Sequence, residues 1–355
     1  MKKLALWLTT LLLVAGFVYP AGTRQAAAAA PEYTEIATFI EGQLVISPAK
    51  SVLVNGSAYV PVKLAGQIPG FTVAADAAGV TLTGSKGSAK LNKDNSILYK
   101  SSNYVSFKTL LKLGAIDGKY ASSAIALFVW STEDGKNKSN SMLYAISKLP
   151  GTMGTALGKK VYLYGHPGSH WVKSVQYVDD YNQNLVLQNE AGTEWVLDLN
   201  EYVDNTMYTA AHLELLQKVY NGTTVWTRNP NINNSPFKNL EKVTISNFRS
   251  NPANGNLEVI IRRANGQEIP IEIDSAETYV DYLDKILCFQ NPRTLFKISD
   301  KMWSVIRDEK ATNGMTMTEL LLSWGDPDSV NDNYLVYGNQ YVYFVNNKVF
   351  SIVNL

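Results

Sequence analysis

The stretch at residues 51–64 reads Ser-Val-Leu-Val-Asn-Gly-Ser-Ala-Tyr-Val-Pro-Val-Lys-Leu, and it decides how the first part of the chain folds. Two apolar runs flank Asn55-Gly56, the dipeptide that most strongly signals a two-residue β-hairpin turn. Residues 62–68 predict a short helix, and strands return within residues 71–82. The stretch therefore predicts a mainly β module with short helices.

The same order of strand, short helix and glycine recurs further along the chain. Residues 59–64 align with residues 104–109 at an offset of 45, and Gly70 aligns with Gly114 at an offset of 44. The second copy carries Ser106 where the first has proline. We interpret this pattern as an internal duplication within one module.

This module, residues 33–130, resembles the copper amine oxidase N-terminal-like domain, also called the stalk domain, through its Asn-Gly-x-x-Tyr-Val-Pro-Val signature. The resemblance implies a β module of a kind common in secreted proteins of Gram-positive bacteria. It does not imply oxidase activity. The chain contains neither the His-x-His pair that would help bind copper nor the Asn-Tyr-Asp/Glu context of the quinone-forming tyrosine.

Residues 131–157 are predicted to form a linker. Residues 131–141 are polar and include Asp134-Gly135, a combination typical of loops. A short helix is expected at residues 142–148.

A second internal repeat follows the predicted linker. Residues 158–163 match residues 222–227, and residues 185–192 match residues 259–266. Each copy has a strand led by glycine, a second strand, a hairpin and a helical segment. Because an isolated hairpin is only marginally stable, we expect each copy to form a small β-barrel-like sheet covered by its helix. The predicted units span residues 158–219 and 220–296, with helices at 210–219 and 279–287.

The last predicted module, residues 297–355, is a helix followed by a β-meander. Thr316 and Glu319 have the spacing of a capping box, which marks a helix start. Trp324 is expected on the apolar face of that helix as a core residue. The module resembles the small fold of the SmpA/OmlA-type envelope lipoproteins, which act as accessory subunits. The strand positions expected to face the helix are Tyr341, Tyr343 and Val345.

Residues 1–30 are interpreted as a secretory signal peptide. Lys2 and Lys3 precede an apolar run at residues 4–18 that is shorter than the roughly 20 residues needed to span a bilayer. Small residues follow, so cleavage is expected near Ala28 and Ala29. The mature protein is therefore expected to be secreted or associated with the cell wall, and not an integral membrane protein.

Charge and cysteine content narrow the function further. Without the leader, the formal charge changes from +1 to −2, because three basic side chains leave and 31 acidic ones remain. A nearly neutral chain lacks the strong positive field that nucleic-acid binding needs, so we expect no nucleic-acid partner. Cys288 is the one cysteine, which precludes an internal disulfide and is typical of secreted Gram-positive proteins. We interpret Cys288 as a buried apolar residue.

The titratable residues point to no catalytic, cofactor or metal site. His166 and His170 flank Pro167 and Gly168, which disfavour a helix, so we interpret them as surface-loop residues. His212 lies in a predicted helix. The acidic residues read as turn, helix-end or strand-exterior positions without the spacing of a calcium loop or an evident common cleft. They are Asp179, Asp180, Glu194, Asp198, Asp326, Asp328 and Asp332.

The sequence thus predicts a secreted, non-catalytic binding or scaffolding protein of the bacterial cell envelope, with no cofactor. Its expected partners are cell-wall glycan or other secreted proteins. Two alternatives remain open. One is a cell-wall hydrolase with an unrecognised carboxylate pair, and the other is an accessory or inhibitory subunit of a secreted enzyme complex. The sequence does not identify the ligand-binding residues.

Overall fold

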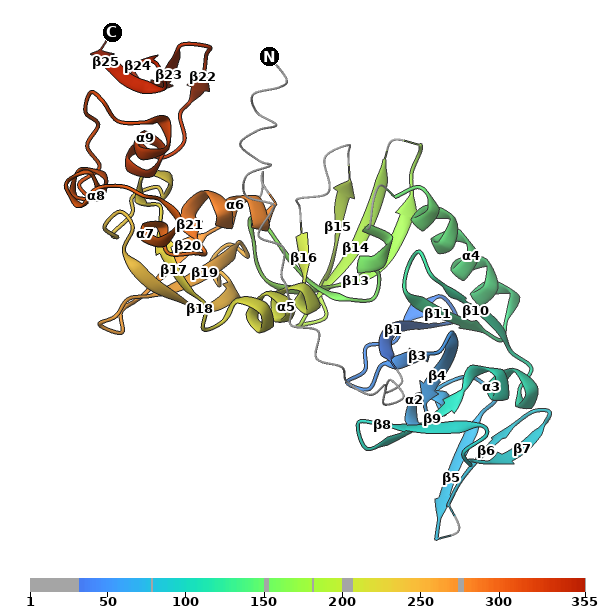
Figure 1. Cartoon of the computed structure of the whole chain (residues 1–355). Coiled ribbons are helices and arrows are strands. Elements are labelled where there is room, and N and C mark those ends of the chain that lie inside the picture. Colours follow the sequence, from blue (N-terminus) through green and yellow to red (C-terminus); the bar gives the residue numbers. More distant parts are fainter. Residues whose placement is uncertain are drawn as a thin grey trace.

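The computed structural model describes residues 32–77, 79–149, 153–180, 182–199, 207–273 and 278–354. These residues are mainly β, with short helices and several separate sheets, which confirms the predicted fold class (Figure 1). The predicted leader, including Ala28 and Ala29, lies outside the described residues. Among the described helices, none is both long and apolar enough to cross a bilayer.

The first module contains an eight-stranded sheet in the order β10-β11-β1-β3-β4-β9-β8, with β2 paired to β1, and a three-stranded sheet β5-β6-β7. Its strands are β1 (Tyr33–Ile40), β2 (Gln43–Leu44), β3 (Ser51–Val54), β4 (Ser57–Pro61), β5 (Thr72–Asp76), β6 (Gly79–Gly84), β7 (Gly87–Lys90), β8 (Ser96–Tyr99), β9 (Ser102–Ser106), β10 (Asp117–Ala121) and β11 (Ala126–Trp130). Its helices are α2 (Val62–Ala65) and α3 (Phe107–Leu113). The predicted β3–β4 hairpin is confirmed, because Asn55 and Gly56 adopt φ values of 48° and 76°, which this tight turn requires.

The duplicated segments of the first module pair with each other. Strand β4 runs antiparallel to β9, and Val60 lies opposite Val105, its counterpart at the offset of 45. The two copies are therefore related by an approximate two-fold axis through this residue pair. Ser106, which replaces the proline of the first copy, caps helix α3 by accepting a hydrogen bond from the Thr109 backbone N–H at 3.2 Å.

The structure differs from the prediction over residues 131–141, where a loop was expected. Helix α4 (Glu133–Ser147) begins there, and the Thr132 hydroxyl caps it by accepting from the Gly135 N–H at 3.0 Å. Gly135 does not mark a turn. A Cβ at this position would lie 1.8 Å from Oε2 of Glu41, whose carboxylate binds Ser131 and Thr132. Because Gly135 has no side chain, Glu41 at the end of β1 can approach the helix closely.

Helix α4 joins the first module to the first repeat. Its side chains Met142, Ala145 and Ile146 are buried in one apolar core with Phe39 and Phe128 of the first module. The same core continues into the first repeat, through Val161, Val172, Leu185 and Leu187. Helix α4 thus contributes to packing between these two parts of the chain.

The two repeats have the same sheet topology. The first forms a five-stranded sheet β15-β14-β13-β12-β16, and the second a sheet β20-β19-β18-β17-β21. In both, four consecutive strands form a meander and a fifth strand pairs with the first. The first repeat contains β12 (Lys160–Leu163), β13 (His166–Tyr177), β14 (Gln183–Asn189), β15 (Glu194–Leu199) and β16 (Met207–Thr209), after the 3-10 helix η1 (Met153–Ala156). The second contains β17 (Thr224–Thr227), η2 (Asn229–Asn231), β18 (Lys242–Ser250), β19 (Leu257–Arg262), β20 (Glu268–Glu272) and β21 (Leu287–Cys288).

Hydrogen bonds at matching positions support the predicted duplication. The Gly158 N–H donates to the Val172 carbonyl at 2.7 Å, and the Gly222 N–H donates to the Ile245 carbonyl at 2.8 Å. A β-bulge follows each acceptor, at Lys173 in the first repeat and at Ser246 in the second. The repeats therefore share local irregularities as well as strand order.

The helices of the two repeats occupy different places in chain order. Helix α5 (Ala210–Tyr220) follows the fifth strand of the first repeat, whereas α6 (Tyr279–Ile286) precedes the fifth strand of the second. Leu213 and Leu216 of α5 pack into the core of the second repeat. Both helices exist as predicted, but α5 covers the sheet of the neighbouring unit.

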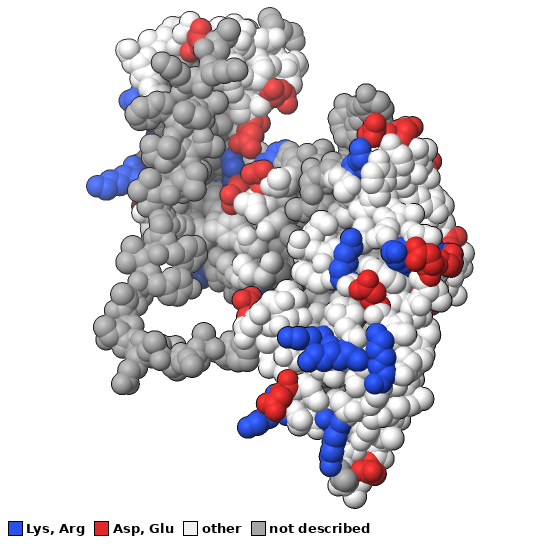
Figure 2. Space-filling view, turned by 90° about the vertical axis from the view of Figure 1, so that its right-hand side faces the viewer, with Lys and Arg blue, Asp and Glu red and all other residues white. Residues whose placement is uncertain are grey.

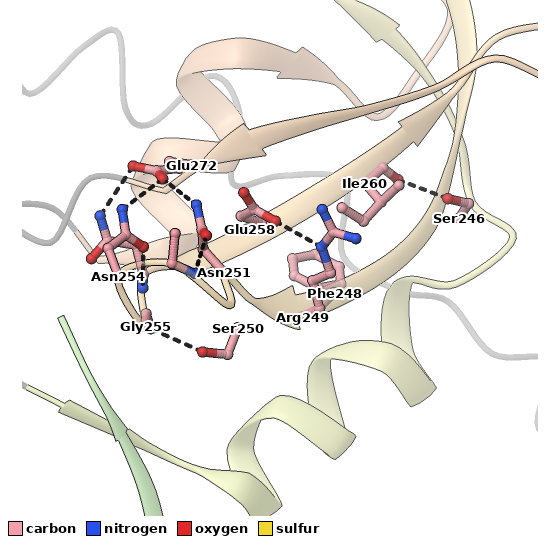
Figure 3. A network of polar contacts seen from close by, with 12 residues as sticks. Ser246, Phe248, Arg249, Ser250, Asn251, Asn254, Gly255, Glu258, Ile260 and Glu272 are labelled. Atoms are coloured by element: carbon pink, nitrogen blue, oxygen red, sulfur yellow. Dashed lines mark hydrogen bonds and ion pairs between the residues drawn. The ribbon is translucent and has the colours of Figure 1, made fainter. Parts of the chain in front are cut away.

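A polar network joins the turn after β18 to β20 (Figure 3). The amide groups of Asn251, Asn254 and Asn256 all donate to the Glu272 carboxylate. The same turn contacts the first repeat, because the Asn256 side chain accepts from the Gly165 N–H at 3.0 Å. This turn therefore links the two repeats.

The C-terminal module has three helices and a four-stranded antiparallel sheet, β22-β23-β24-β25, and the helices at residues 300–307 and 317–324 share one apolar core with the sheet. Its elements are α7 (Pro292–Leu295), α8 (Asp300–Arg307), α9 (Met317–Trp324), β22 (Ser329–Val330), β23 (Tyr334–Tyr337), β24 (Gln340–Val345) and β25 (Lys348–Asn354). The predicted capping box of α9 is confirmed, with Thr316 and Glu319 bonding reciprocally.

The predicted inward face of this last sheet is wrong. Leu335, Val342 and Val349 are buried, whereas Tyr343 and Val345 are 37% and 51% exposed. Trp324 contacts Tyr337 on β23, and its indole N–H donates to the Glu309 carbonyl at 3.0 Å. Trp324 is half-buried at the edge of the core.

Candidate functional site

An open groove of about 1010 Å³ lies between helix α4 and the sheet of the first repeat. We call it the α4 groove. Most of its polar lining can form hydrogen bonds without carrying charge. The helix contributes Asn137, Asn140, Ser141 and Tyr144, and strand β13 contributes Ser174, Gln176 and Tyr177. Gln43, Val186 and Glu194 also line the groove.

The sequence of α4 explains why its polar side lines the groove. Met142, Ala145 and Ile146 are buried against the sheets, which fixes the rotation of the helix. The amide and hydroxyl side chains on the remaining face are then left exposed beside β13. Ser139 is buried, and the exposed positions Asn137 and Asn140 lie on either side of it.

Two tyrosines contact each other at the groove. The rings of Tyr144 and Tyr177 are 5.1 Å apart between centroids and nearly perpendicular, at 72°. Tyr144 is 51% exposed and Tyr177 37% exposed, so both rings remain available to a ligand. The pair joins a helix to a strand 33 residues later in the chain.

Charged neighbours hold this tyrosine pair in place. The Tyr177 hydroxyl and the Lys148 ammonium both donate to Asp180, each at 3.0 Å. The hydrogen bond from Lys148, and then that from Tyr177, lower the pKa of the Asp180 carboxyl. The Lys148 ammonium also lies 5.6 Å from the centre of the Tyr144 ring. The rings are thus positioned before any ligand arrives.

Lys173 and Glu194, which both line the groove, form an ion pair, and Lys138 of the same lining pairs with Asp134. Lys173 is the bulged residue of β13, between Val172 and Ser174 in the ladder to β14. A bulge turns a side chain away from the regular alternation of a strand. This local irregularity accounts for Lys173 lining the groove beside Ser174.

The histidines are not surface-loop residues, which corrects the sequence prediction. His166 and His170 both lie in strand β13, where Pro167 and Gly168 are accommodated in its first residues. Both rings contact Trp195, with centroids 5.0 and 5.5 Å away. Burial, and then the proximity of His166, lower the pKa of His170. His212 lies on α5, and its ring contacts Tyr279.

Five of the acidic residues weighed as candidates make separate local contacts. Asp179 accepts from Asn182, Asp180 from Lys148, and Glu194 from Lys173. In the C-terminal module, Asp326 pairs with Arg228 at 2.8 Å, and Asp328 accepts from the Gly338 N–H. Among the described residues, no group of three or more His, Cys, Asp or Glu side chains is arranged to hold a metal ion.

Cys288 ends strand β21 and is partly buried. Burial raises the pKa of its thiol above the ordinary value. A thiol in that state is a poor nucleophile at neutral pH.

Comparison of the chain with family models, curated proteins and solved structures returned no match.

Proposed function

We propose that the protein is a secreted, non-catalytic binding or scaffolding protein of the bacterial cell envelope that binds cell-wall glycan in the α4 groove. The observation that carries this proposal is the exposed Tyr144–Tyr177 pair beside a lining of amides and hydroxyls. In this proposal, the stalk-like first module and the second repeat serve as supporting scaffold.

The chemistry of the lining suits a neutral sugar chain. Asn and Gln side chains each offer donors and acceptors, which match the mixed character of sugar hydroxyls. The faces of aromatic rings pack against the C–H surfaces of sugar rings. Because Lys148 and Asp180 already fix the two rings, little side-chain entropy is lost on binding.

A hydrolase is less well supported by this groove. Glycoside hydrolysis generally uses two carboxyl groups about 5 to 10 Å apart, on either side of the scissile bond. The lining contains one carboxylate, Glu194, which is paired with Lys173. If the protein were instead an accessory or inhibitory subunit, it would capture a secreted enzyme and would not bind peptidoglycan.

The test is co-sedimentation of the purified protein with isolated peptidoglycan. Tyr144→Ala and Tyr177→Ala are each expected to weaken binding by about fivefold to tenfold, because an aromatic contact contributes about 1 kcal/mol. Tyr343→Ala is the matched control, since Tyr343 is as exposed as Tyr177, at 37%, but lies on the C-terminal sheet.

Three results would contradict the proposal. Equal binding by all three variants would exclude the groove as the glycan site. Release of soluble fragments from the peptidoglycan would instead indicate the hydrolase. Capture of a secreted enzyme, with its activity changed and no binding to peptidoglycan, would indicate the accessory subunit.

A further inference from the structure

Three lysines lie on or beside helix α3 on the surface of the first module. Lys108 and Lys112 are exposed on the helix itself, and Lys86 is exposed in the turn between β6 and β7. We call this surface the α3 lysine face. Lys108 and Lys112 are one helical turn apart, a rise of about 6 Å.

A backbone contact places Lys86 beside the helix. The Lys86 N–H donates to the Leu113 carbonyl at 2.8 Å, at the end of α3. Lys86, Lys108 and Lys112 therefore share one region of the surface.

This region carries a net positive charge, although the formal net charge of the whole chain is close to zero. Residues 60–130 contain eight lysines and three aspartates, without arginine or glutamate. Residues 131–355 contain 20 basic and 25 acidic side chains. Figure 2 shows basic side chains, in blue, on the lower half of the face in view, at the height of the first module in Figure 1.

The charges of the α3 lysine face are not neutralised within the described part of the chain. None of its three ammonium groups forms an ion pair there. The lysines therefore remain free to attract an anionic partner.

We propose that the α3 lysine face binds an anionic phosphodiester polymer of the cell surface, at a site separate from the α4 groove. Lysine ammonium groups act as hydrated point charges that suit phosphates on a flexible chain. Several such contacts along a polymer release counterions, which gives binding that falls steeply with salt.

The face fits a polyol-phosphate chain better than a nucleic acid. Proteins that bind single-stranded nucleic acids place aromatic rings beside the cations so that bases can stack. The exposed residues of α3 are instead Lys108 and Lys112. A polymer without bases needs only the row of charges.

The experiment measures binding of the full protein to purified poly(glycerol phosphate) at several salt concentrations. The Lys108→Gln/Lys112→Gln double variant is expected to weaken binding by about tenfold or more at low salt. The slope of log K against log salt should fall by about 1.4, because each phosphate contact on a single chain contributes about 0.7. Lys218→Gln/Lys301→Gln is the control, since both lysines are exposed on other helices.

Three results would overturn the proposal. They are no binding to the polymer at about 50 mM salt, an equal loss in the control variant, and tighter binding to DNA with the same number of phosphates. The Tyr144→Ala variant separates this proposal from the preceding one. It should bind the polymer normally while binding peptidoglycan about fivefold to tenfold more weakly, so that failure of one site leaves the other testable.

Discussion

Glu272 is a single residue that makes the stability of the second repeat depend on pH. The amides of Asn254 and Asn256 donate to its carboxylate at 2.9 and 3.0 Å, and Asn251 adds a third hydrogen bond. The bonds from Asn254, and then from Asn256, lower the pKa of Glu272 below its ordinary 4.5. Folding therefore favours the ionised carboxylate at this position.

The lowered pKa of Glu272 predicts the direction of the pH effect on stability. Its contribution is present above the ordinary pKa of 4.5 and is lost as the pH falls through the lower folded value. Glu272→Gln should reduce the free energy of unfolding by about 1 kcal/mol at pH 7, allowing for exposure to solvent. It should also flatten the loss of stability below pH 4.5.

Chemical denaturation at several pH values checks this prediction. Glu268→Gln is the matched control, because Glu268 is exposed on the same strand, β20. If the two variants showed the same stability and the same pH profile, the asparagine network would have no energetic role.

At the scale of elements, the sequence predicts best where adjacent residues mark a boundary. Asn55-Gly56 fixed the β3–β4 turn, and Thr316 with Glu319 fixed the start of α9. Asn346 and Asn347, with φ values of 53° and 59°, form the turn between β24 and β25 in the same way. Such signals depend on local backbone preferences, which a sequence contains in full.

The first part of helix α4, before residue 142, could not be predicted because its signals are tertiary. Residues 133–141 are polar, and Asp134-Gly135 suggests a turn. The close approach of Glu41, 94 residues before Gly135, explains the glycine. Since the α4 groove depends on this helix, its lining escaped prediction too. The one usable signal was Thr132, a good N-cap residue, before a segment that ends in apolar residues.

The inward face of the last sheet could not be predicted from alternation alone. Both alternating sets in β24 include large side chains, with Tyr341 and Tyr343 in one and Val342 and Phe344 in the other. A shift of one residue exchanges the two faces of a strand. Packing against α9 determines which face is buried, because Val342 and Phe344 belong to the apolar core that contains this helix.

Trp324 connects α9 to the rest of its module through two contacts. Its ring lies 5.3 Å from that of Tyr337, and its N–H donates to the Glu309 carbonyl. Trp324→Ala should lower the free energy of unfolding by about 2 to 3 kcal/mol, below the 3 to 5 of a fully buried Trp. Trp324→Phe, which keeps an aromatic ring but loses the donor, should cost about 1 kcal/mol.

Thermal unfolding followed by far-UV circular dichroism, which does not depend on tryptophan fluorescence, checks that Trp324→Ala loses more stability than Trp324→Phe. Tyr343→Ala is the control within the same module, because that side chain points away from the core. Unchanged stability of Trp324→Ala together with loss of a bound partner would show that Trp324 belongs to a binding surface instead.

For the whole molecule, the decisive feature is that neighbouring parts share cores. One apolar cluster includes Phe128 of the first module, Ile146 of α4 and Leu187 of the first repeat. Leu216 of α5 packs in the core of the second repeat. The sequence predicts the repeats because duplication is visible in residue patterns. It does not predict this shared packing, because contacts between units leave no periodic signal.

The duplication supplies its own control for testing the contact between the first module and the first repeat. Gly158 and Gly222 are equivalent, with φ values of 72° and 85° and matching backbone hydrogen bonds. A Cβ at Gly158 would lie 2.3 Å from the Cβ of Ala37 in β1, whereas a Cβ at Gly222 would meet nothing within 4 Å. The two positions therefore differ in packing and not in backbone conformation.

Alanine at either glycine should cost about 1 to 2 kcal/mol, because both backbones are left-handed. Gly158→Ala should cost about 2 kcal/mol more, since its methyl group would force β1 and the first repeat apart. Thermal unfolding measures the difference in stability. Limited proteolysis between residues 131 and 157 shows whether the contact has loosened, which is expected for Gly158→Ala alone. Equal effects of the two substitutions would mean that the first module and the first repeat do not depend on this contact.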